Sequence, residues 1–437
     1  MAREMKDSQK NWIGRIPYNW ELKRIKNIIQ QSKDGIKIGP FGSALTNKTI
    51  EEGKYNVYSQ ANLIASDFSG TKNTIDSKTF EELKGYEVFP DDVCLSMMGT
   101  IGKCKKVPKG ITRGIMDSHL IKIRLSETVD SRFFEYVYDK DLGGVCFAQM
   151  QYDKKGFIMD GLNTSIVKNL YFPLPPRNEQ IRIADYLDKE CSRIDAAIEQ
   201  TRASIEEYKK LKQAVITKAV TKGIRPDRQM KDSGIEWIGE IPANWRVQKL
   251  KYSIKWKSEK GQPNATVLSL YRDYGVIPKD SRDDNYNVTS LDTSTYKVVS
   301  KGDLVINKMK AWQGSMAISD YEGIVSPAYH VCIITNPDIQ LKYLHYLLRN
   351  HLYLPEYKRL STGMRIGQWD LGFDDFKDLP FILPPVKEQV EIVNYLEDKT
   401  TEIDTVIEQK EQLLVEMESY KKSLIFEYVT GKKEVPA

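Results

Sequence analysis

The stretch FPLPPRNEQIRIADYLDKECSRIDAAIEQ at residues 172–200 returns as FILPPVKEQVEIVNYLEDKTTEIDTVIEQ at residues 381–409, with 14 identities in 29 positions. Each copy contains Leu-Pro-Pro followed by Glu-Gln; proline is tolerated in the first turn of a helix, and an acidic residue suits its start. Beyond this point the chain is rich in helix-forming residues, with no Gly or Pro before Gly223 in the first copy and Gly431 in the second. We therefore predict two long helices of about 45 residues, or roughly 67 Å each.

Apolar side chains recur along both predicted helices with a period of seven residues. One seam starts at Leu187 and another at Leu396, each accompanied by a second seam offset by four residues, which is typical of a coiled coil. The alternative is that each helix packs separately on its own domain, but one domain cannot cover so long an apolar stripe. We predict an antiparallel pair with pseudo-twofold symmetry, formed by Leu187, Ile194, Ile198, Ile205, Tyr208, Val215, Leu396, Ile403, Ile407, Leu414, Met417 and Leu424.

A second repeat, which we call the tag, lies well upstream of each helix. MKDSQKNWIGRIPYNWELKRIK at residues 5–26 matches MKDSGIEWIGEIPANWRVQKLK at residues 230–251 in 12 of 22 positions. The repeated tryptophans are interpreted as core staples between tag and domain rather than stacking platforms; they are Trp12, Trp20, Trp237 and Trp245. The first helix leads into the second tag, and the second helix leads to the C-terminus, while the N-terminus lies just before the first tag. The order of the parts is therefore circular, and we expect the two termini to lie close together.

The segments between tag and helix, residues 27–171 and 252–380, look little alike, and each is long enough for one domain. We call them the first and second variable domains. Both alternate short β-rich runs with Gly, Asn and Asp turns, so we expect an α+β fold, each domain being mixed α/β with a curved, mostly antiparallel sheet. The expected organisation is residues 1–171 (first variable domain with its tag), 172–223 (first helical region), 224–380 (second variable domain with its tag) and 381–437 (second helical region).

Composition narrows the class of protein. The 437 residues are 41% hydrophobic and 29% charged, with no apolar run near the ~18 residues of a membrane span and no signal-peptide core at the start, so we expect a cytoplasmic, folded protein. The net charge of +5 permits nucleic-acid binding but does not demand it. Five scattered cysteines form no C-x-x-C pair and are expected to be buried thiols, without a disulfide framework or zinc site.

Signatures of catalysis are not found. The string nearest to a P-loop, Gly99-Thr-Ile-Gly-Lys103, lacks both the spacing and the Ser/Thr that a P-loop needs. No Gly-rich nucleotide fingerprint or methyltransferase tetrad is present, acidic clusters of the nuclease type are unconvincing, and the four histidines show no triad or metal spacing. We expect a binding protein with no catalytic residues, no metal and no cofactor on this chain.

Candidate contact loops combine small residues, amides, hydroxyls and basic side chains. Amides and arginine read base edges in the major groove, while lysines bind phosphates. Any single loop of this kind is more often plain surface, but similar loops recur at matching places in both variable domains. The candidates are Lys37, Ser43, Ser59, Gln60, Asn62, Thr100, Lys103, Lys105, Gln149, Tyr152 and Lys154 in the first domain, and Ser269, Tyr271, Arg272, Asn307, Lys308, Lys310, Trp312, Gln313, Arg365 and Gln368 in the second.

These features together resemble the specificity (S) subunits of type I restriction–modification enzymes. The resemblance spans the full chain; its most specific parts are the paired LPPRNEQIRIADYLD and LPPVKEQVEIVNYLE and the string KGDLVINKMKAWQG. It implies two target recognition domains, each reading one half of a split site in double-stranded DNA, on an antiparallel helical rod. Because SMMGTIGKCKK stands in the first domain where the second has NKMKAWQG, we expect different half-sites and an asymmetric target.

The resemblance also implies partners. These are two methyltransferase (M) subunits carrying S-adenosylmethionine and, in the full complex, ATP- and Mg²⁺-dependent restriction/translocase (R) subunits. The helices and tags are expected to dock them, because those parts are shared while the reading domains differ. Two other hypotheses remain open: an adaptor that bridges two proteins without touching DNA, and an unrecognised enzyme such as a nuclease.

Overall fold

The structure is a computed structural model that describes residues 3–45, 48–49, 52–153, 161–262, 264–272, 274–282, 292–363 and 369–436. Its contacts divide the chain into two compact units. Unit 1 is Met1–Arg202 with Gln412–Ala437, and unit 2 is Ala203–Glu411. Each unit combines one tag, one variable domain and a part of both long helices.

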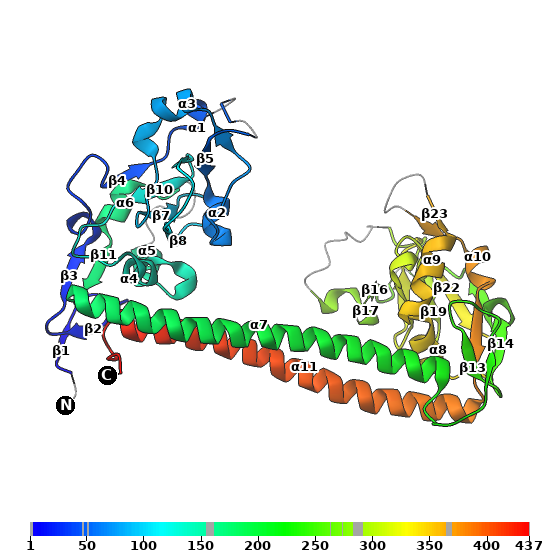
Figure 1. The fold of residues 1–437 in the computed structure, drawn as a ribbon. Helices are drawn as coiled ribbons and strands as arrows, with labels where there is room; N and C mark the ends of the chain where they lie inside the picture. The colour runs from blue at the N-terminus through cyan, green and yellow to red at the C-terminus, as the bar shows by residue number, and fades with distance from the viewer. Residues whose placement is uncertain are drawn as a thin grey trace. The chain divides into compact units, whose positions relative to one another are not determined.

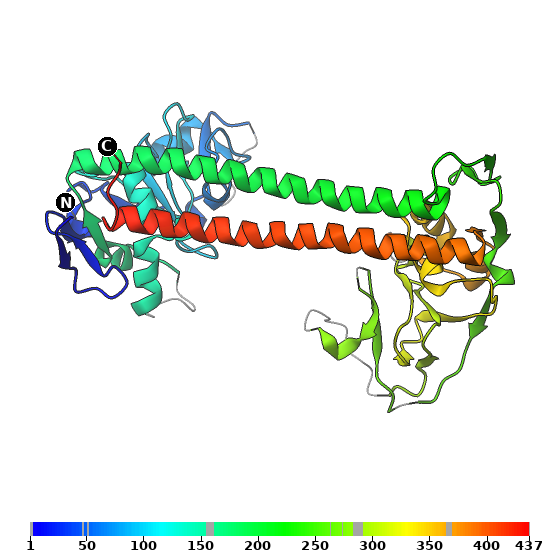
Figure 2. The ribbon, with the colours of Figure 1, turned by 90° about the horizontal axis from the view of Figure 1, so that it is seen from below.

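The two long helices are α7 (Arg177–Lys222) and α11 (Val386–Val429), with 46 and 44 residues, close to the predicted length. They lie side by side and run in opposite directions (Figures 1 and 2). In unit 1 the early part of α7 packs on the end of α11, where Tyr186 and Tyr428 have ring centroids 4.6 Å apart. In unit 2 the end of α7 packs on the early part of α11, where the Lys212 Nζ donates to Asp404 at 2.6 Å.

All the positions predicted for the helix seam are buried or half-buried. Those that are buried are Leu187, Ile198, Ile205, Leu396, Ile403, Ile407 and Leu424, and those that are half-buried are Ile194, Tyr208, Val215, Leu414 and Met417. Two lysines that interrupt the seams, Lys212 and Lys421, pair with acids at repeat-related places. Lys212 binds Asp404 in unit 2, and in unit 1 Lys421 donates to Asp195 at 2.7 Å.

Short strands connect each tag to the start of a long helix. Within the tags, β1 (Met5–Asp7) pairs with β2 (Arg15–Pro17), and β12 (Met230–Asp232) pairs with β13 (Glu240–Pro242). The last tag strands are β3 (Glu21–Arg24) and β14 (Arg246–Lys249), which pair with β11 (Tyr171–Leu174) and β25 (Pro380–Leu383). Because β11 and β25 run directly into the Leu-Pro-Pro sequence, each tag holds the entry to a helix.

The glutamate of each Glu-Gln pair joins the helix to its tag. In unit 1 the Trp20 indole donates to Glu179 at 3.0 Å, and Arg3 binds the same carboxylate at 2.6 Å. In unit 2 Arg228 forms the equivalent ion pair with Glu388. Burial alone would raise the pKa of Glu388, but hydrogen bonding from Arg228 helps to outweigh burial, and the pKa is lowered. Trp20 and its repeat Trp245 are both fully buried beneath these ion pairs, as staples between tag and helix.

The glutamine of each pair is a fully buried clamp. Gln180 accepts from the Asp130 backbone N–H at 2.9 Å and donates to the carbonyls of Thr128 and Pro175 at 3.0 and 2.8 Å. Asp130 is the N-cap of α4 (Ser131–Tyr138), so the clamp ties the long helix to the first variable domain.

Gln389 repeats this pattern in unit 2. Its side chain accepts from the Gln340 N–H at 2.8 Å and donates to the carbonyls of Asp338 and Pro384, each at 2.8 Å. Gln340 caps α8 (Leu341–Leu348), which therefore takes the place of α4 in the second domain. The recurring Glu-Gln thus sets how each long helix meets its own domain.

The first variable domain is built on an antiparallel four-stranded sheet in the order β4-β10-β7-β8, beside a three-stranded sheet in the order β6-β5-β9 in which β5 and β9 are parallel. Its main core, shared with unit 1's parts of the long helices, packs Phe133 and Phe172 edge to face at 5.8 Å. The elements are β4 (Ile36–Ile38), α1 (Gly42–Leu45), β5 (Tyr55–Tyr58), α2 (Gln60–Ala65), β6 (Thr74–Ile75), α3 (Ser77–Glu82), β7 (Val93–Ser96), β8 (Cys104–Lys106), β9 (Gly114–Met116), β10 (Leu120–Ile123), α5 (Val145–Asp153) and α6 (Thr164–Asn169).

The second variable domain has the corresponding sheet in the order β15-β22-β19-β20, with three two-stranded sheets beside it. The sheets of both domains are mostly antiparallel, as predicted. The elements are β15 (Ile254–Lys257), β16 (Leu268–Tyr271), β17 (Gly275–Pro278), β18 (Lys297–Val299), β19 (Leu304–Asn307), η6 (Ala311–Gln313), β20 (Met316–Ile318), β21 (Gly323–Val325), β22 (Tyr329–Ile334), η7 (His351–Tyr353), α9 (Leu354–Leu360), β23 (Ser361–Thr362), β24 (Asp370–Leu371) and α10 (Phe373–Lys377).

The two ends of the described chain meet in unit 1, as the circular arrangement predicts. Arg3 Nε lies 3.7 Å from the Glu434 carboxylate. No helix among the described residues is long and apolar enough to cross a membrane. All five cysteines are buried free thiols, and burial raises the pKa of Cys94 to about 12, which keeps its thiol protonated at neutral pH.

We predict that Gln389→Ala loosens the junction between α11 and the second variable domain. The substitution removes three hydrogen bonds: the one to the Pro384 carbonyl is buried, and the other two are part-buried. A buried group left without its partner costs roughly 1–3 kcal/mol. Hydrogen–deuterium exchange should then accelerate at the start of α8, while α4, held by Gln180 in unit 1, should be unchanged. Lys387→Ala, at an exposed neighbouring position, is the control. Unaltered exchange in α8 would show that the clamp contributes little.

Candidate nucleic-acid interface

A turn between two sheet strands is held by the same backbone hydrogen bonds in both variable domains. In the first domain the turn joins β7 to β8, and the Met97 peptide donates to the His119 carbonyl at 2.9 Å and accepts from Leu162 at 2.8 Å. In the second domain it joins β19 to β20, where the Lys308 peptide donates to Ala328 at 3.4 Å and accepts from Leu371 at 3.0 Å. We call these two turns the β7–β8 turn and the β19–β20 turn.

The two turns present different side chains on this shared frame. The first has methionines at positions 97 and 98 followed by Gly99 and Thr100, and Met98 is 50% exposed. The second has Lys308, an exposed Met309 and Lys310, then the aromatic ring of Trp312. A constant backbone that carries a variable set of methionine, lysine, hydroxyl and aromatic groups suits the recognition of different ligands of one general kind.

Two candidate loops of the first domain come together beside the β7–β8 turn. The Gln60 amide donates to the Thr100 hydroxyl at 2.6 Å, which joins the start of α2 to the turn. These loops line a shallow pocket with Met98 and His119. His119 was not among the predicted residues; its ring is 54% exposed and lies 3.2 Å from the Asp117 carboxylate.

In the second domain the equivalent region is richer in basic and aromatic groups. Trp312 packs against Trp369 with ring centroids 5.2 Å apart, and its indole donates to the Met309 carbonyl at 3.2 Å. Lys308 donates to Asp370 at 2.8 Å, whereas Lys310 is exposed at the tip of the turn. Trp369 is a second residue that the sequence analysis missed.

Several predicted contact residues of the first domain are engaged inside the fold. Asn62 is buried, accepts from the Ser59 N–H at 2.9 Å and donates to the carbonyls of Asp67 and Gly70, so its amide completes a capping box on α2. Gln149 is also buried, and it accepts from the Tyr171 N–H at 2.8 Å. Their hydrogen bonds stabilise turns and a strand, so both amides have a structural role.

The predicted lysines of the first domain have internal partners as well. Lys37 donates to the Gly85 carbonyl at 2.9 Å, Lys103 pairs with Asp141, and Lys105 donates to Glu135 at 2.7 Å. Burial would lower the pKa of Lys105, but the neighbouring Glu135 carboxylate outweighs it and raises the pKa. Tyr152 is 59% exposed and packs on Trp12 with ring centroids 5.1 Å apart.

The other described candidates of the second domain lie on β16, directly after it, at the end of β19 and in η6. Ser269 and Tyr271 are half-buried on β16, Arg272 is exposed just after it, and Asn307 is half-buried at the end of β19. Gln313 is half-buried in η6. The side chain of Ser43 and the whole of Lys154, Arg365 and Gln368 fall outside the described residues.

No cluster of metal-binding side chains accompanies these turns in the described part of the chain. Groups of three or more His, Cys, Asp or Glu side chains arranged to hold an ion are not found there. Burial, assisted by the charge of Arg349, lowers the pKa of His345 to about 3, so this ring is neutral at physiological pH.

Comparison with known proteins identifies the family. The family described as Type I restriction modification DNA specificity domain matches twice, over residues 17–207 and 244–415, which together are well over half of the chain. This chain belongs to that family. It is a type I specificity subunit, a class that is not catalytic by itself.

Two relatives from Methanocaldococcus jannaschii match nearly end to end. The putative type I restriction enzyme MjaX specificity subunit is 23% identical, with 98% of this chain and 96% of the relative aligned. The type I restriction enzyme MjaVIII specificity subunit is 24% identical, with 96% and 94% aligned. The StySPI specificity subunit of Salmonella potsdam is 25% identical over 62% of this chain and 60% of its own.

Solved structures show the same fold. The HsdS subunit from Thermoanaerobacter tengcongensis superposes with a TM-score of 0.55 at 16% identity, covering 98% of this chain and all of the other. A chain of a type I R-M system, from work on complex assembly and conformational transition, reaches a TM-score of 0.67 at 14% identity, covering 96% and 99%. The α+β class with paired long helices that the sequence predicts is therefore confirmed.

We predict that two neighbouring substitutions on α2 have different consequences. Asn62→Ala removes the capping box and should destabilise the helix by about 1–2 kcal/mol, seen as faster amide exchange in α2. Gln60→Ala loses a side-chain contact to Thr100 rather than a helix cap, so α2 should keep its exchange rates. Equal effects of both variants on α2 exchange would contradict this difference between the capping amide of Asn62 and the amide of Gln60.

Proposed function

We propose that each variable domain reads one half of an asymmetric, two-part site in double-stranded DNA. The observation that carries the proposal is the shared frame of the β7–β8 and β19–β20 turns, which holds different side chains at matching places. Arginine, lysine and amide groups discriminate bases in the major groove, and lysines bind phosphates. The described residues that we assign to reading are Gln60, Thr100 and His119 in the first domain and Arg272, Lys310, Trp312 and Gln313 in the second.

The domain boundaries and the role of the helices belong to the same proposal. Residues 27–171 and 252–380 form the two target recognition domains, and α7 with α11 sets the spacer between the half-sites. The helices and tags dock two methyltransferase subunits that bring S-adenosylmethionine, and the full complex adds restriction subunits that use ATP and Mg²⁺. The repetition of helices and tags supports this assignment, because repeated surfaces suit two copies of one partner.

The alternative function, an adaptor that never touches DNA, predicts a different result in a duplex mobility-shift assay. Phosphate contacts make DNA affinity fall as the salt concentration rises. A chain that binds its methylated motif more tightly than an unrelated duplex, with affinity falling between low and moderate salt, supports DNA reading. A chain that binds no duplex at low salt, alone or with its methyltransferase partner, supports the adaptor.

The division of labour between the domains can be tested by domain exchange. Replacing residues 27–171 by the corresponding segment of another family member should change one half of the methylated motif and leave the other half intact. Methylome sequencing of cells that express the chimaera with its methyltransferase gives the readout, and the matched exchange of residues 252–380 is the control. A change in both halves would exclude independent reading.

The ruler role of the helices can be tested by insertion. Four residues added near Thr201 and four near Lys410 should lengthen each helix by roughly 6 Å. Because DNA rises about 3.4 Å per base pair, the methylated motif should gain one to two base pairs of spacer with the same half-sites. An insertion in one helix only is the control, since its partner keeps its length and a bulge can absorb the change. An unchanged spacer in an active, doubly extended protein would show that the helices are not the ruler.

A further inference from the structure

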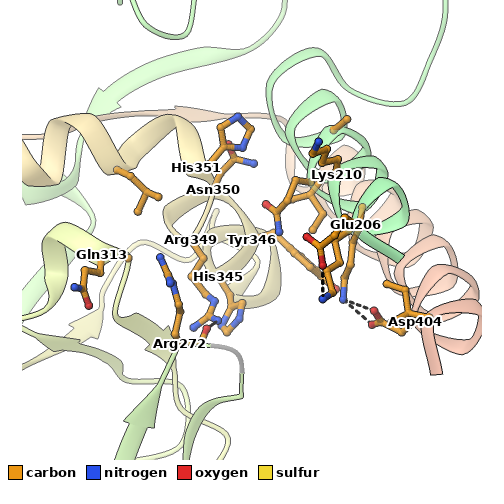
Figure 3. Close-up of a pocket in the computed structure, with 18 residues that line it drawn as sticks. Glu206, Lys210, Arg272, Gln313, His345, Tyr346, Arg349, Asn350, His351 and Asp404 are labelled. Carbon is orange, nitrogen blue, oxygen red and sulfur yellow. Dashed lines mark hydrogen bonds and ion pairs between the residues drawn. The ribbon is translucent and has the colours of Figure 1, made fainter. Parts of the chain in front are cut away.

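A groove in unit 2 lies between the long helix α7 and the second variable domain. One wall is α7 from Glu206 to Ile216, and the other is formed by the turn after β16 and by η6 (Figure 3). Two of the residues on the domain wall, Arg272 and Gln313, are also predicted reading residues. The groove is therefore continuous with the surface that we assign to the second half-site.

The groove has an excess of positive charge. Five lysines or arginines and two acids line it. The acids are already engaged by lysines of α7, since Lys209 donates to Glu206 at 2.9 Å and Lys212 to Asp404. Among the described residues Lys210 and Arg272 have no carboxylate within ion-pairing distance; Figure 3 draws them on the helix wall and the domain wall.

The floor of the groove adds a fixed positive group. Arg349 donates to the Met316 carbonyl at 2.9 Å and to the carbonyl of Arg272, which holds its guanidinium in place. Beside it, the neutral His345 ring receives the backbone N–H of Ile318 at 3.3 Å and contributes no opposing charge. Lys210, Arg272 and Arg349 thus present cations on the helix, the domain and the floor of one groove.

The equivalent part of unit 1 is built differently. Where α7 has Lys209 and Lys210, the repeat in α11 has Glu418 and Ser419. The first variable domain also approaches α11 there, since the Lys422 backbone oxygen lies 3.3 Å from where a Cβ on Gly143 would be. The basic groove is therefore a property of unit 2 and does not follow from the repeated fold.

We propose that this groove holds the phosphodiester backbone of the DNA next to the half-site read by the second domain, with Lys210 of α7 as a phosphate contact. The proposal rests on the proposed function. It extends DNA binding from the variable domain to a long helix, which then acts as a phosphate-binding wall as well as a support. The contact is electrostatic and independent of base sequence.

The test measures DNA affinity of the full chain across salt concentrations by fluorescence anisotropy, with a duplex carrying its methylated motif and one without it. Lys210→Ser, which installs the residue of the repeat, should weaken both duplexes to a similar degree. It should also make the fall in affinity between 50 and 200 mM salt about threefold smaller, as expected for one lost phosphate contact. Lys210→Arg should behave as the original chain, and Lys218→Ser, at an exposed position of α7 outside the groove, is the matched control.

The outcomes separate the two proposals. In one outcome the unsubstituted chain prefers its motif, but Lys210→Ser leaves the salt dependence of DNA affinity unchanged. This result would overturn the groove as a phosphate site and leave the proposed function standing. A variant that changes which sequence is preferred without a change in salt dependence also overturns the groove as a phosphate site. An original chain with no preference for its motif overturns the proposed function. If Lys210→Ser still reduces the salt dependence of that unspecific binding, the groove is supported as a phosphate site.

Discussion

The buried glutamine at the start of each long helix is the contact on which the architecture depends. Gln180 and Gln389 are themselves fully buried, and each satisfies one backbone N–H and two carbonyls. A shorter side chain could not reach these groups, and a carboxylate would face two carbonyl oxygens instead of donating to them. The direction of each helix relative to its own domain is thereby fixed by three hydrogen bonds that tolerate little adjustment.

This fixed junction explains how the two variable domains can diverge. The clamp touches the caps of α4 and α8 through backbone groups, and the frame of each reading turn is likewise made of backbone hydrogen bonds. Neither the clamp nor the turn frame uses the side chains of the turn. Met97 and Lys308 can therefore occupy equivalent positions without a change in these backbone hydrogen bonds. Specificity can change while the attachment to the helices stays constant.

The helices were predictable because their signals are local and periodic. The predicted stop at Gly223 agrees with the end of α7 at Lys222, and the seven-residue period marks the buried seam. The residues that we propose for reading were not equally predictable, because Gln60 and Asn62 have similar chemistry and lie two residues apart. What distinguishes them is the groups that approach them in the fold: Asn62 binds backbone carbonyls as a buried capping amide, and the part-buried Gln60 binds the Thr100 hydroxyl. His119 and Trp369 gave no signal at all, since their place beside the turns comes from strand pairing.

The register of the helix pair is determined by contacts at the helix ends rather than by contacts along the seam. A slip of seven residues would move Lys212 from Asp404 to Glu397 or Glu411, both of them acids, so this ion pair alone permits alternatives. The contacts at the helix ends do not permit such alternative registers. Gly431, with φ of +69°, follows α11 and packs so closely on the Pro17 ring that a Cβ would not fit. Gly223, with φ of +75°, follows α7 beside Arg228 and Trp245, and its left-handed backbone favours glycine there. Since each tag also staples the start of the opposing helix, any slip would have to open the tag.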